Sequence, residues 1–384
     1  MATRARGSRF WDPDENEWLD LQMALGAVLL GHADPVVNAA VSEQLGRGVL
    51  FSVPATLETI VAGELRAIFP EYEAFRFAKN GSDATSAAVR LARAATGREP
   101  VITCGYHGWP DWSTAARAEV SGIPQAVRGL SRAHPPGAVE RVLEDLARPG
   151  PGYAAVVIDP TARDLPDPAQ FTALRQLCWS TGTVLVFDEV VSGFRLGLRG
   201  FAGLSGVFPD LACYGKALGN GLPLSVLAGR RALMDGLPAA AVTTTFGGDC
   251  AALAAAQVVL AEVRAPNFYL HLETLGTELR AGLERLLSVH GLADRLVCAG
   301  YPAHTRIFSA RHNAADENRA RWIVAREMGR RGIFWQGSNV LCRDHTEADL
   351  KRVLAAYEEI VPVLARELAG FRAVSESGRQ LRRK

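Results

Sequence analysis

The stretch TVLVFDEV, residues 183–190, runs through four consecutive apolar residues before it reaches Asp188. A second apolar run, YAAVVIDP at 153–160, has the same form, and the helix-like stretch DPAQFTALRQLCWSTG at 167–182 lies between them. Near-continuous Val/Ile runs separated by a helix are typical of a parallel sheet covered on both faces. Asp188 then ends a buried strand. A carboxylate there needs a partner, which could be a functional group, a salt bridge or a helix cap.

The same alternation of strands and helices extends outward from this stretch. Ser82 can cap a helix that Gly97 ends. We therefore predict an α/β fold with a large domain, residues 51–260, built on a mostly parallel central sheet. An N-terminal segment, 1–50, is expected to pack with a smaller C-terminal α+β domain, 261–384. The supporting patterns are strands at 74–80, 100–106, 211–215, 225–230 and 304–310 and helices at 82–97, 267–289, 316–331 and 346–369.

Bulk composition excludes some classes of protein. The chain has 384 residues and a formal net charge of +1, which does not indicate a nucleic acid or an anionic membrane as partner. LQMALGAVLLG, residues 21–31, is too short and too punctuated to span a bilayer, and the N-terminus lacks a signal-peptide core. The six cysteines are scattered and form no C-x-x-C pair. We expect a cytoplasmic protein without a membrane partner.

A lysine stands in the apolar, glycine-rich stretch LACYGKALGNGLP, residues 211–223. The chain has only four lysines, and Lys216 has no carboxylate near it in sequence. A buried lysine is costly unless it is paired or loses its proton, and a lysine that loses its proton is the kind that forms Schiff bases. The alternative is a lysine that snorkels from a loop to solvent.

Two further loops follow predicted strands. KNGSDAT, 79–85, places Gly81 and Ser82 at a strand-to-helix turn, which suits a phosphate but also a plain capped turn. CGYHGWPDW, 104–112, offers Tyr106 as an aromatic platform, or is only a packed aromatic turn. An anion loop, a buried carboxylate and an isolated lysine together suit pyridoxal 5'-phosphate (PLP). The lysine loop is not a Walker A motif, and no G-x-G-x-x-G follows the first strand.

These motifs resemble those of class III (fold-type I) PLP-dependent aminotransferases, in the group around glutamate-1-semialdehyde aminomutase. The resemblance implies a homodimer with shared active sites and one small-molecule amino donor and one carbonyl acceptor. It runs through nearly the whole chain and includes WLDLQMALGAVLLGHADPVV, RFAKNGSDATSAAVRLARAATGR, CGYHGW, VFDEVVSGFR, GVFPDLACYGKALGNGLPLSVLAGR, TTTFGGD and HTEADL.

The resemblance also implies roles at matching positions. Lys216 and Asp188 would be catalytic: Lys216 would form the Schiff base with the cofactor and shuttle the proton, and Asp188 would pair with the pyridine nitrogen. Val190 and Tyr106 would pack on opposite faces of the ring.

The phosphate end of the cofactor has its own implied residues. Gly81 and Ser82 would hold the phosphate, and Thr245 would reach the phosphate in the neighbouring subunit. Asp83, usually glutamate in the family, and His107 would support these groups from behind. No residue pattern indicates a metal site.

The chain also departs from the family pattern. The segment that usually precedes ARGSRFWD is short here, TFGGDC follows the threonine, and Asp159 stands where glutamate is common, with a loop after it that looks shortened. Arg195, Arg306 and Arg343 could each hold a carboxylate, or pair on the surface. We expect an aminotransferase that aminates a ketone or aldehyde of a specialised metabolite, such as a keto-sugar or cyclitol. The alternatives are glutamate-1-semialdehyde 2,1-aminomutase, another PLP outcome such as an epimerase or decarboxylase, and a non-catalytic binding module on the same fold.

Overall fold

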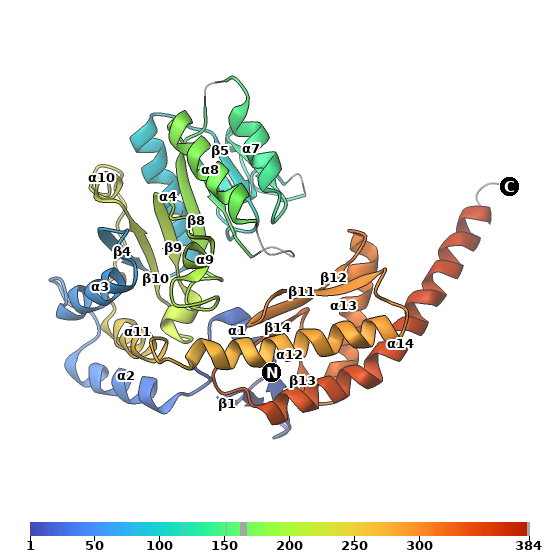
Figure 1. Cartoon of the computed structure of the whole chain (residues 1–384). Helices are drawn as coiled ribbons and strands as arrows, with labels where there is room; N and C mark the ends of the chain where they lie inside the picture. The colour runs from blue at the N-terminus through green and yellow to red at the C-terminus, as the bar shows by residue number, and fades with distance from the viewer. Residues whose placement is uncertain (118, 151, 162–166, 382–384) are drawn as a thin grey trace. The chain divides into compact units, whose positions relative to one another are not determined.

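The computed structural model describes residues 1–117, 119–150, 152–161 and 167–381, and only the backbone of 370–381 (Figure 1). The loop expected to be shortened, after Asp159, falls partly at 162–166, outside the described residues. The chain divides into a larger unit, residues 26–28 and 34–266, and a smaller unit, residues 1–25, 29–33 and 267–384. Residues 34–50, which we grouped with the small domain, fall in the larger unit, where helix α2 (Pro35–Arg47) packs against helix α11 (Cys250–Glu262).

The larger unit is built on a seven-stranded sheet in the order β4-β10-β9-β8-β7-β5-β6. The neighbours from β9 to β6 run parallel, and β10 is antiparallel to both β4 and β9. The predicted mostly parallel sheet is therefore present. Its strands are β4 (Ala74–Ala78), β5 (Val101–Cys104), β6 (Ser131–His134), β7 (Ala155–Ile158), β8 (Val184–Glu189), β9 (Leu211–Tyr214) and β10 (Ser225–Gly229).

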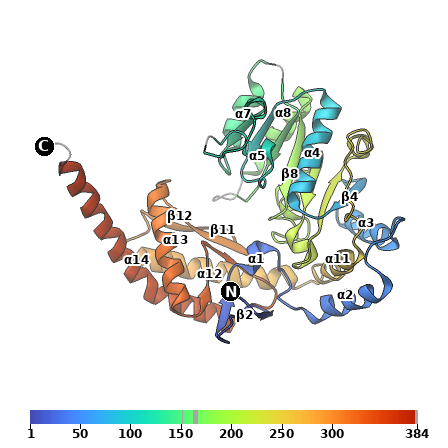
Figure 2. The ribbon, with the colours of Figure 1, turned by 180° about the vertical axis from the view of Figure 1, so that it is seen from behind.

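Helices cover both faces of this sheet (Figures 1 and 2). The helices of the larger unit are α2 (Pro35–Arg47), α3 (Thr56–Ile68), α4 (Gly81–Thr96), α5 (Asp111–Thr114), α6 (Gln125–Arg128), α7 (Val139–Ala147), α8 (Pro168–Thr181), α9 (Gly200–Ser205), η1 (Lys216–Gly219), α10 (Arg231–Met234) and α11 (Cys250–Glu262). The apolar side of α4 packs on one face, together with Val184 and Val186. Residues of α7, α8 and α9 pack on the other face, together with Leu185 and Phe187.

The alternation along β8 decides where its two terminal carboxylates go. Successive side chains of a strand point to opposite faces. Asp188 therefore shares a face with Val184 and Val186, the face that α4 covers. Glu189 points to the other face, where its carboxylate accepts hydrogen bonds from the backbone N–H groups of Phe201 and Ala202 at 2.8 Å each, in the first turn of α9. One strand end thus supplies a carboxylate to each side of the sheet.

The smaller unit contains two short sheets, in the orders β1-β2-β3-β13 and β11-β12-β14. The predicted strand at 304–310 is present as β12, but we did not predict its partner β11 or the N-terminal strands one by one. Within the described residues, no helix combines the length and the apolar character needed to cross a membrane. The elements are β1 (Arg4–Arg6), β2 (Arg9–Trp11), β3 (Glu17–Asp20), α12 (Phe268–Val289), β11 (Leu296–Tyr301), β12 (His304–Ser309), α13 (Ala314–Gly329), β13 (Ile333–Phe334), β14 (Ser338–Val340) and α14 (Glu347–Leu381).

The short element α1 (Met23–Gly26) is not a right-handed helix. Met23, Ala24 and Leu25 have φ values of 45°, 51° and 57°, so the backbone makes a left-handed turn before Gly26. Left-handed backbone costs about 1–2 kcal/mol for each residue other than glycine. Such strain persists only where surrounding structure imposes it.

Candidate active site

The loops that carry the candidate residues emerge from the same edge of the large sheet. β5, β7, β8 and β9 are parallel, and β4 points the same way because β10 is antiparallel to both β4 and β9. The carboxyl ends of such strands meet at one edge, which is where open α/β sheets bind ligands. The residues at or just after these strand ends include Gly81, Ser82, Tyr106, His107, Asp159, Asp188 and Lys216.

The Asp188 carboxylate is buried and already oriented. His107 Nδ1 lies 2.8 Å from Asp188 Oδ2, and the backbone N–H of Val190 donates to Asp188 Oδ1 at 3.2 Å. His107 Nε2 is buried and has no hydrogen-bond partner within the described residues. A buried N–H without an acceptor is costly, so we assign the imidazole proton to Nδ1, where it is donated to Asp188. His107 therefore holds one oxygen of Asp188 and fixes the plane of the carboxylate.

Lys216 begins η1 with a positive φ of 41°, an unfavourable conformation for a residue with a side chain. Its side chain is largely withdrawn from water. Burial lowers the pKa of the Lys216 amine, and the negative charges of Asp188 and Asp159 only partly oppose this effect. Within the described residues, its Nζ makes no hydrogen bond or ion pair. A lysine in this setting holds its proton weakly, which is the state required of a nucleophilic amine.

Val190 connects the lysine loop to the predicted phosphate loop. A Cβ placed on Gly81 would lie 2.8 Å from both methyl carbons of Val190, and one placed on Gly215 would lie 3.5 Å from Val190 Cγ1. The side chain thus lies between the start of α4 and the residue before Lys216. Glycine at 81 is required by this close approach, because any larger residue would displace Val190.

The start of α4 has the form of an anion site. Gly81 and Ser82 occupy its first turn, where backbone N–H groups lack intrahelical acceptors. The Asp83 carboxylate accepts hydrogen bonds from the N–H groups of Lys79 at 3.2 Å and Asn80 at 2.8 Å, so it stabilises the turn from behind. A Cβ on Gly108 would lie 2.4 Å from Ser82 Oγ, which places the aromatic loop against this turn.

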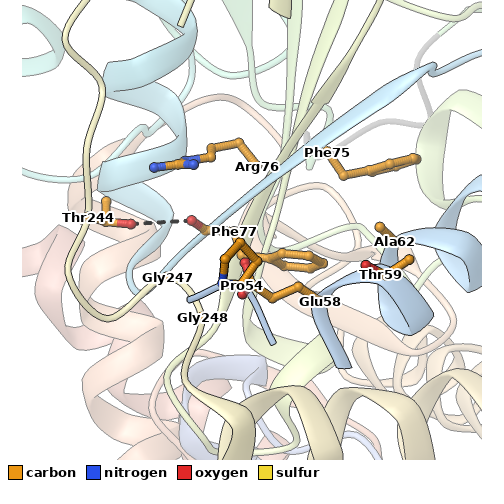
Figure 3. Close-up of a pocket in the computed structure, with 10 residues that line it drawn as sticks. All are labelled: Pro54, Glu58, Thr59, Ala62, Phe75, Arg76, Phe77, Thr244, Gly247 and Gly248. Atoms are coloured by element: carbon orange, nitrogen blue, oxygen red, sulfur yellow. Dashed lines mark hydrogen bonds between the residues drawn. The ribbon is translucent and has the colours of Figure 1, made fainter. Parts of the chain in front are cut away.

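Tyr106 and Thr245 are both exposed. Tyr106 is 63% exposed and lies in the same loop as His107. Thr245 follows Thr244, which lines a cavity of ≈430 Å³ together with Gly247 (Figure 3). Thr244 Oγ1 donates to the carbonyl oxygen of Phe77. Thr245 is exposed and makes no hydrogen bond within the described residues.

Two residues that the sequence analysis named without a role in cofactor binding belong to the same surroundings. Asp159 is buried at the end of β7, and its Oδ1 accepts hydrogen bonds from Thr161 N at 2.8 Å and Thr161 Oγ1 at 2.5 Å. Burial, and then the charge of Asp188, raise the pKa of Asp159. Arg195 is buried, and its positive charge acts on Lys216. The signal for Asp159 was the one that identified Asp188, a carboxylate directly after a buried apolar strand.

The arrangement fits PLP. The α4 turn can hold its phosphate, Asp188 presents an oriented carboxylate for its ring nitrogen, and Lys216 offers a desolvated amine for its aldehyde. Val190 lies between these groups, and the buried His107 keeps Asp188 in place.

Comparison with known proteins agrees with this fit. The family model of class-III aminotransferases matches residues 1–300. The chain belongs to the class-III aminotransferase family. Solved relatives include the PLP internal aldimine form of the FumI protein from Sphingopyxis sp. MTA144, with 29% identity and a TM-score of 0.86 over 96% of this chain and 90% of that one. This is a fold-type-I, PLP-dependent enzyme.

The relatives include proteins named as aminomutases and proteins named as transaminases. A glutamate-1-semialdehyde 2,1-aminomutase from Methanosarcina acetivorans is 32% identical over 92% of this chain and 90% of that protein. A 2'-deamino-2'-hydroxyneamine transaminase from Streptomyces kanamyceticus is 35% identical over 94% of this chain and 91% of that protein. An omega-transaminase structure from Sphaerobacter thermophilus has 29% identity and a TM-score of 0.85, covering 95% of this chain and 91% of that one.

Proposed function

We propose that this enzyme moves an amino group from an amino-acid donor to a ketone or aldehyde of a specialised metabolite, such as a keto-sugar or cyclitol. The observation that carries the proposal is the Lys216 amine, which is desolvated and has no ion-pair partner within the described residues, at the sheet edge where Asp188 ends its strand. A lysine that readily gives up its proton is suited to act as a general base.

Each residue then has a defined task. When bound, PLP supplies an electron sink. Lys216 Nζ would carry the 1,3-proton transfer of each half-reaction, taking a proton from one carbon and delivering it to the other within that same half-reaction. Asp188 keeps a proton on the ring nitrogen, and His107 keeps Asp188 oriented through their 2.8 Å contact. Gly81 and Ser82 hold the phosphate, and Val190 and the exposed Tyr106 enclose the ring.

Two observations support a polyhydroxylated acceptor over an amino-acid-like one. The transaminase from Streptomyces kanamyceticus, which is named for 2'-deamino-2'-hydroxyneamine, is among the relatives at 35% identity. In addition, the buried Arg195 is already engaged, because its Nη2 donates to two backbone carbonyls, so it is a poor receptor for a substrate carboxylate. A carboxylate left unpaired in a dry site costs several kcal/mol.

We propose further that the enzyme works as a homodimer in the cytoplasm. Exposed apolar side chains of the larger unit include Phe246, which follows Thr245 in sequence, and Val53, which is 70% exposed and precedes Pro54, a residue that lines the same cavity as Thr244. Large apolar side chains gathered on one surface mark contact sites. Thr245 would then meet the phosphate of the second subunit. All six cysteines are buried and none of them forms a disulfide, which suits a reducing compartment.

The second candidate is the aminomutase reaction, favoured by the relatives of that name. The test is a panel of keto-sugars, cyclitol ketones and glutamate-1-semialdehyde, run in competition with an amino-acid donor. Transfer predicts release of free keto acid and the highest kcat/KM for a neutral polyol acceptor. The aminomutase reading requires glutamate-1-semialdehyde to be the best substrate, with no net keto acid.

A further inference from the structure

Arg195 is almost completely buried, with 1% of its surface exposed. Among the described residues, no side chain buried to this degree is larger. Arg195 follows Phe194, whose φ is 58°, in the tight turn after β8. Arginine is almost never fully buried unless its guanidinium is paired or hydrogen-bonded. The contacts of this group therefore indicate why it is there.

The guanidinium holds a distant segment of backbone. Arg195 Nη2 donates to the carbonyl oxygen of Gly26 at 2.9 Å and to that of Val28 at 3.3 Å. Gly26 has a φ of 85°, and a Cβ placed on it would lie 3.5 Å from Arg195 Nε. A single side chain thus holds two backbone carbonyl groups that are distant in sequence, since Gly26 lies 169 residues and Val28 lies 167 residues before Arg195.

The held segment packs on the lysine loop. A Cβ placed on Gly221 would lie 3.5 Å from Val28 Cγ2, which is ordinary packing distance. Gly221 has a φ of 100° and belongs to the loop that begins at Lys216. The contacts therefore run from Arg195 through Gly26 and Val28 to the loop that carries the reactive amine.

Arg195 also differs in charge from the other groups near the amine. Asp188 and Asp159 favour the protonated form of Lys216 and raise the pKa of its amine. Burial and the charge of Arg195 favour the neutral form and lower that pKa. Among the groups that act on Lys216 in the described residues, Arg195 is the cation. Its charge is permanent, because a guanidinium does not lose its proton in proteins.

We propose that Arg195 is a positioning residue for amino transfer, which clamps the Gly26–Val28 segment against the lysine loop and keeps a permanent positive charge near the Lys216 amine. This rests on the proposed function for the reaction itself, but the clamp and the charge act on the chain without cofactor as well. Substitution can separate the clamp from the charge. Lysine at position 195 keeps the positive charge but loses the planar guanidinium that makes the two hydrogen bonds, whereas methionine loses both.

The experiment compares Arg195→Lys and Arg195→Met with the wild type. Arg175→Met is the matched control, since Arg175 forms a bidentate pair with Asp210 at 2.6 and 2.8 Å in the same unit. The first measurement is the pH dependence of Lys216 labelling by an amine-reactive reagent in the apoenzyme, followed by mass spectrometry. The second is the pH profile of kcat in the holoenzyme.

We expect Arg195→Met to raise the labelling midpoint by about 0.5–1 pH unit, a threefold to tenfold change in proton affinity. Arg195→Lys should keep the midpoint near that of the wild type and lower kcat roughly tenfold, because the clamp is weakened. Arg175→Met should lower the melting temperature and leave the midpoint unchanged.

Three results would overturn the inference. The first is a labelling midpoint equal to that of the wild type in folded Arg195→Met. The second is a kcat equal to that of the wild type in folded Arg195→Lys. The third is an equal midpoint shift in Arg175→Met, which would make the change a general effect of instability. If Arg195→Met does not fold, the kcat of Arg195→Lys decides the clamp. Failure of the wild type to transaminate would remove the proposed function, while the apoenzyme labelling would still decide the role of Arg195.

Discussion

Lys79 and Lys216 both follow strands that end at the same edge of the large sheet, yet their surroundings are opposite. Lys79 Nζ lies 2.5 Å from Asp249 Oδ2 and donates to the carbonyl oxygen of Pro223 at 2.9 Å. Lys216 has burial without such a partner in the described residues, and its pKa is lowered by that burial. A counter-ion keeps a lysine charged and structural, whereas desolvation without one makes its amine available for chemistry.

The strongest test of this contrast is the removal of the unpaired amine. We expect Lys216→Ala to lower the transamination rate by more than about three decades, because nucleophile and proton carrier are lost together. Borohydride treatment of the wild type should fix the cofactor to Lys216, which peptide mapping detects. Lys79→Met is the control and should still be labelled at Lys216. A label on Lys79 would reverse the assignment.

The carboxylate near the reactive lysine should have the next largest effect. Asp188→Asn keeps the shape but cannot hold a proton on the ring nitrogen by charge pairing. We expect kcat to fall by about three decades, equivalent to roughly 4 kcal/mol of transition-state stabilisation. Steady-state kinetics measure this, with Asp210→Asn as a control that should lose stability and keep its kcat. Near-normal turnover in Asp188→Asn would remove the proposed role.

The paired lysine should matter for stability and much less for rate. Lys79→Met leaves Asp249, which also caps α11 through the N–H of Ala251 at 2.9 Å, without its counter-ion. We expect a loss of about 1–3 kcal/mol in the free energy of unfolding, measured by urea denaturation. The kcat should change less than tenfold. A drop of several decades would mean that Lys79, too, takes part in the chemistry.

The same contrast extends to carboxylates and predicts a pH dependence. Glu189 is buried with hydrogen-bond donors instead of a cation, and burial raises its pKa from 4.5 to about 7. The folded state therefore binds this proton more tightly than the unfolded chain. The contribution to stability is fully present below pH 4.5 and is lost as the pH rises through about 7.

We expect Glu189→Gln to remove this dependence, so that the fall in unfolding free energy between pH 5 and pH 8 shrinks by about 1–3 kcal/mol. The variant should also be less stable overall, because the Glu189 oxygens accept from Ser192, Phe201 and Ala202. Urea denaturation at several pH values measures the slope. Glu43→Gln, in the exposed pair with Arg47, is the control, and an equal slope in Glu189→Gln and the wild type would contradict the prediction.

Much of the large sheet was predictable because its strands are continuous apolar runs. The patterns at 153–160 and 183–190 correspond to β7 and β8, and the helix between them is α8. The short strand β6, SRAH, was missed because it is polar and half-exposed at the edge of the sheet, so it carries no apolar run. The N-terminal strands were predicted only as a strand-rich segment, since they have three or four residues each.

The residue sequence by itself determined which side chains end the buried strands, because apolar runs and glycine turns are local features. Asp188, the isolated Lys216 and the turn at Gly81 could therefore be singled out. Only the tertiary structure decided that Lys79 pairs with Asp249, 170 residues away, and that Arg195 holds the backbone at Gly26. The pKa of a lysine depends on its distance from charges and water, and those distances exist only once the chain has folded.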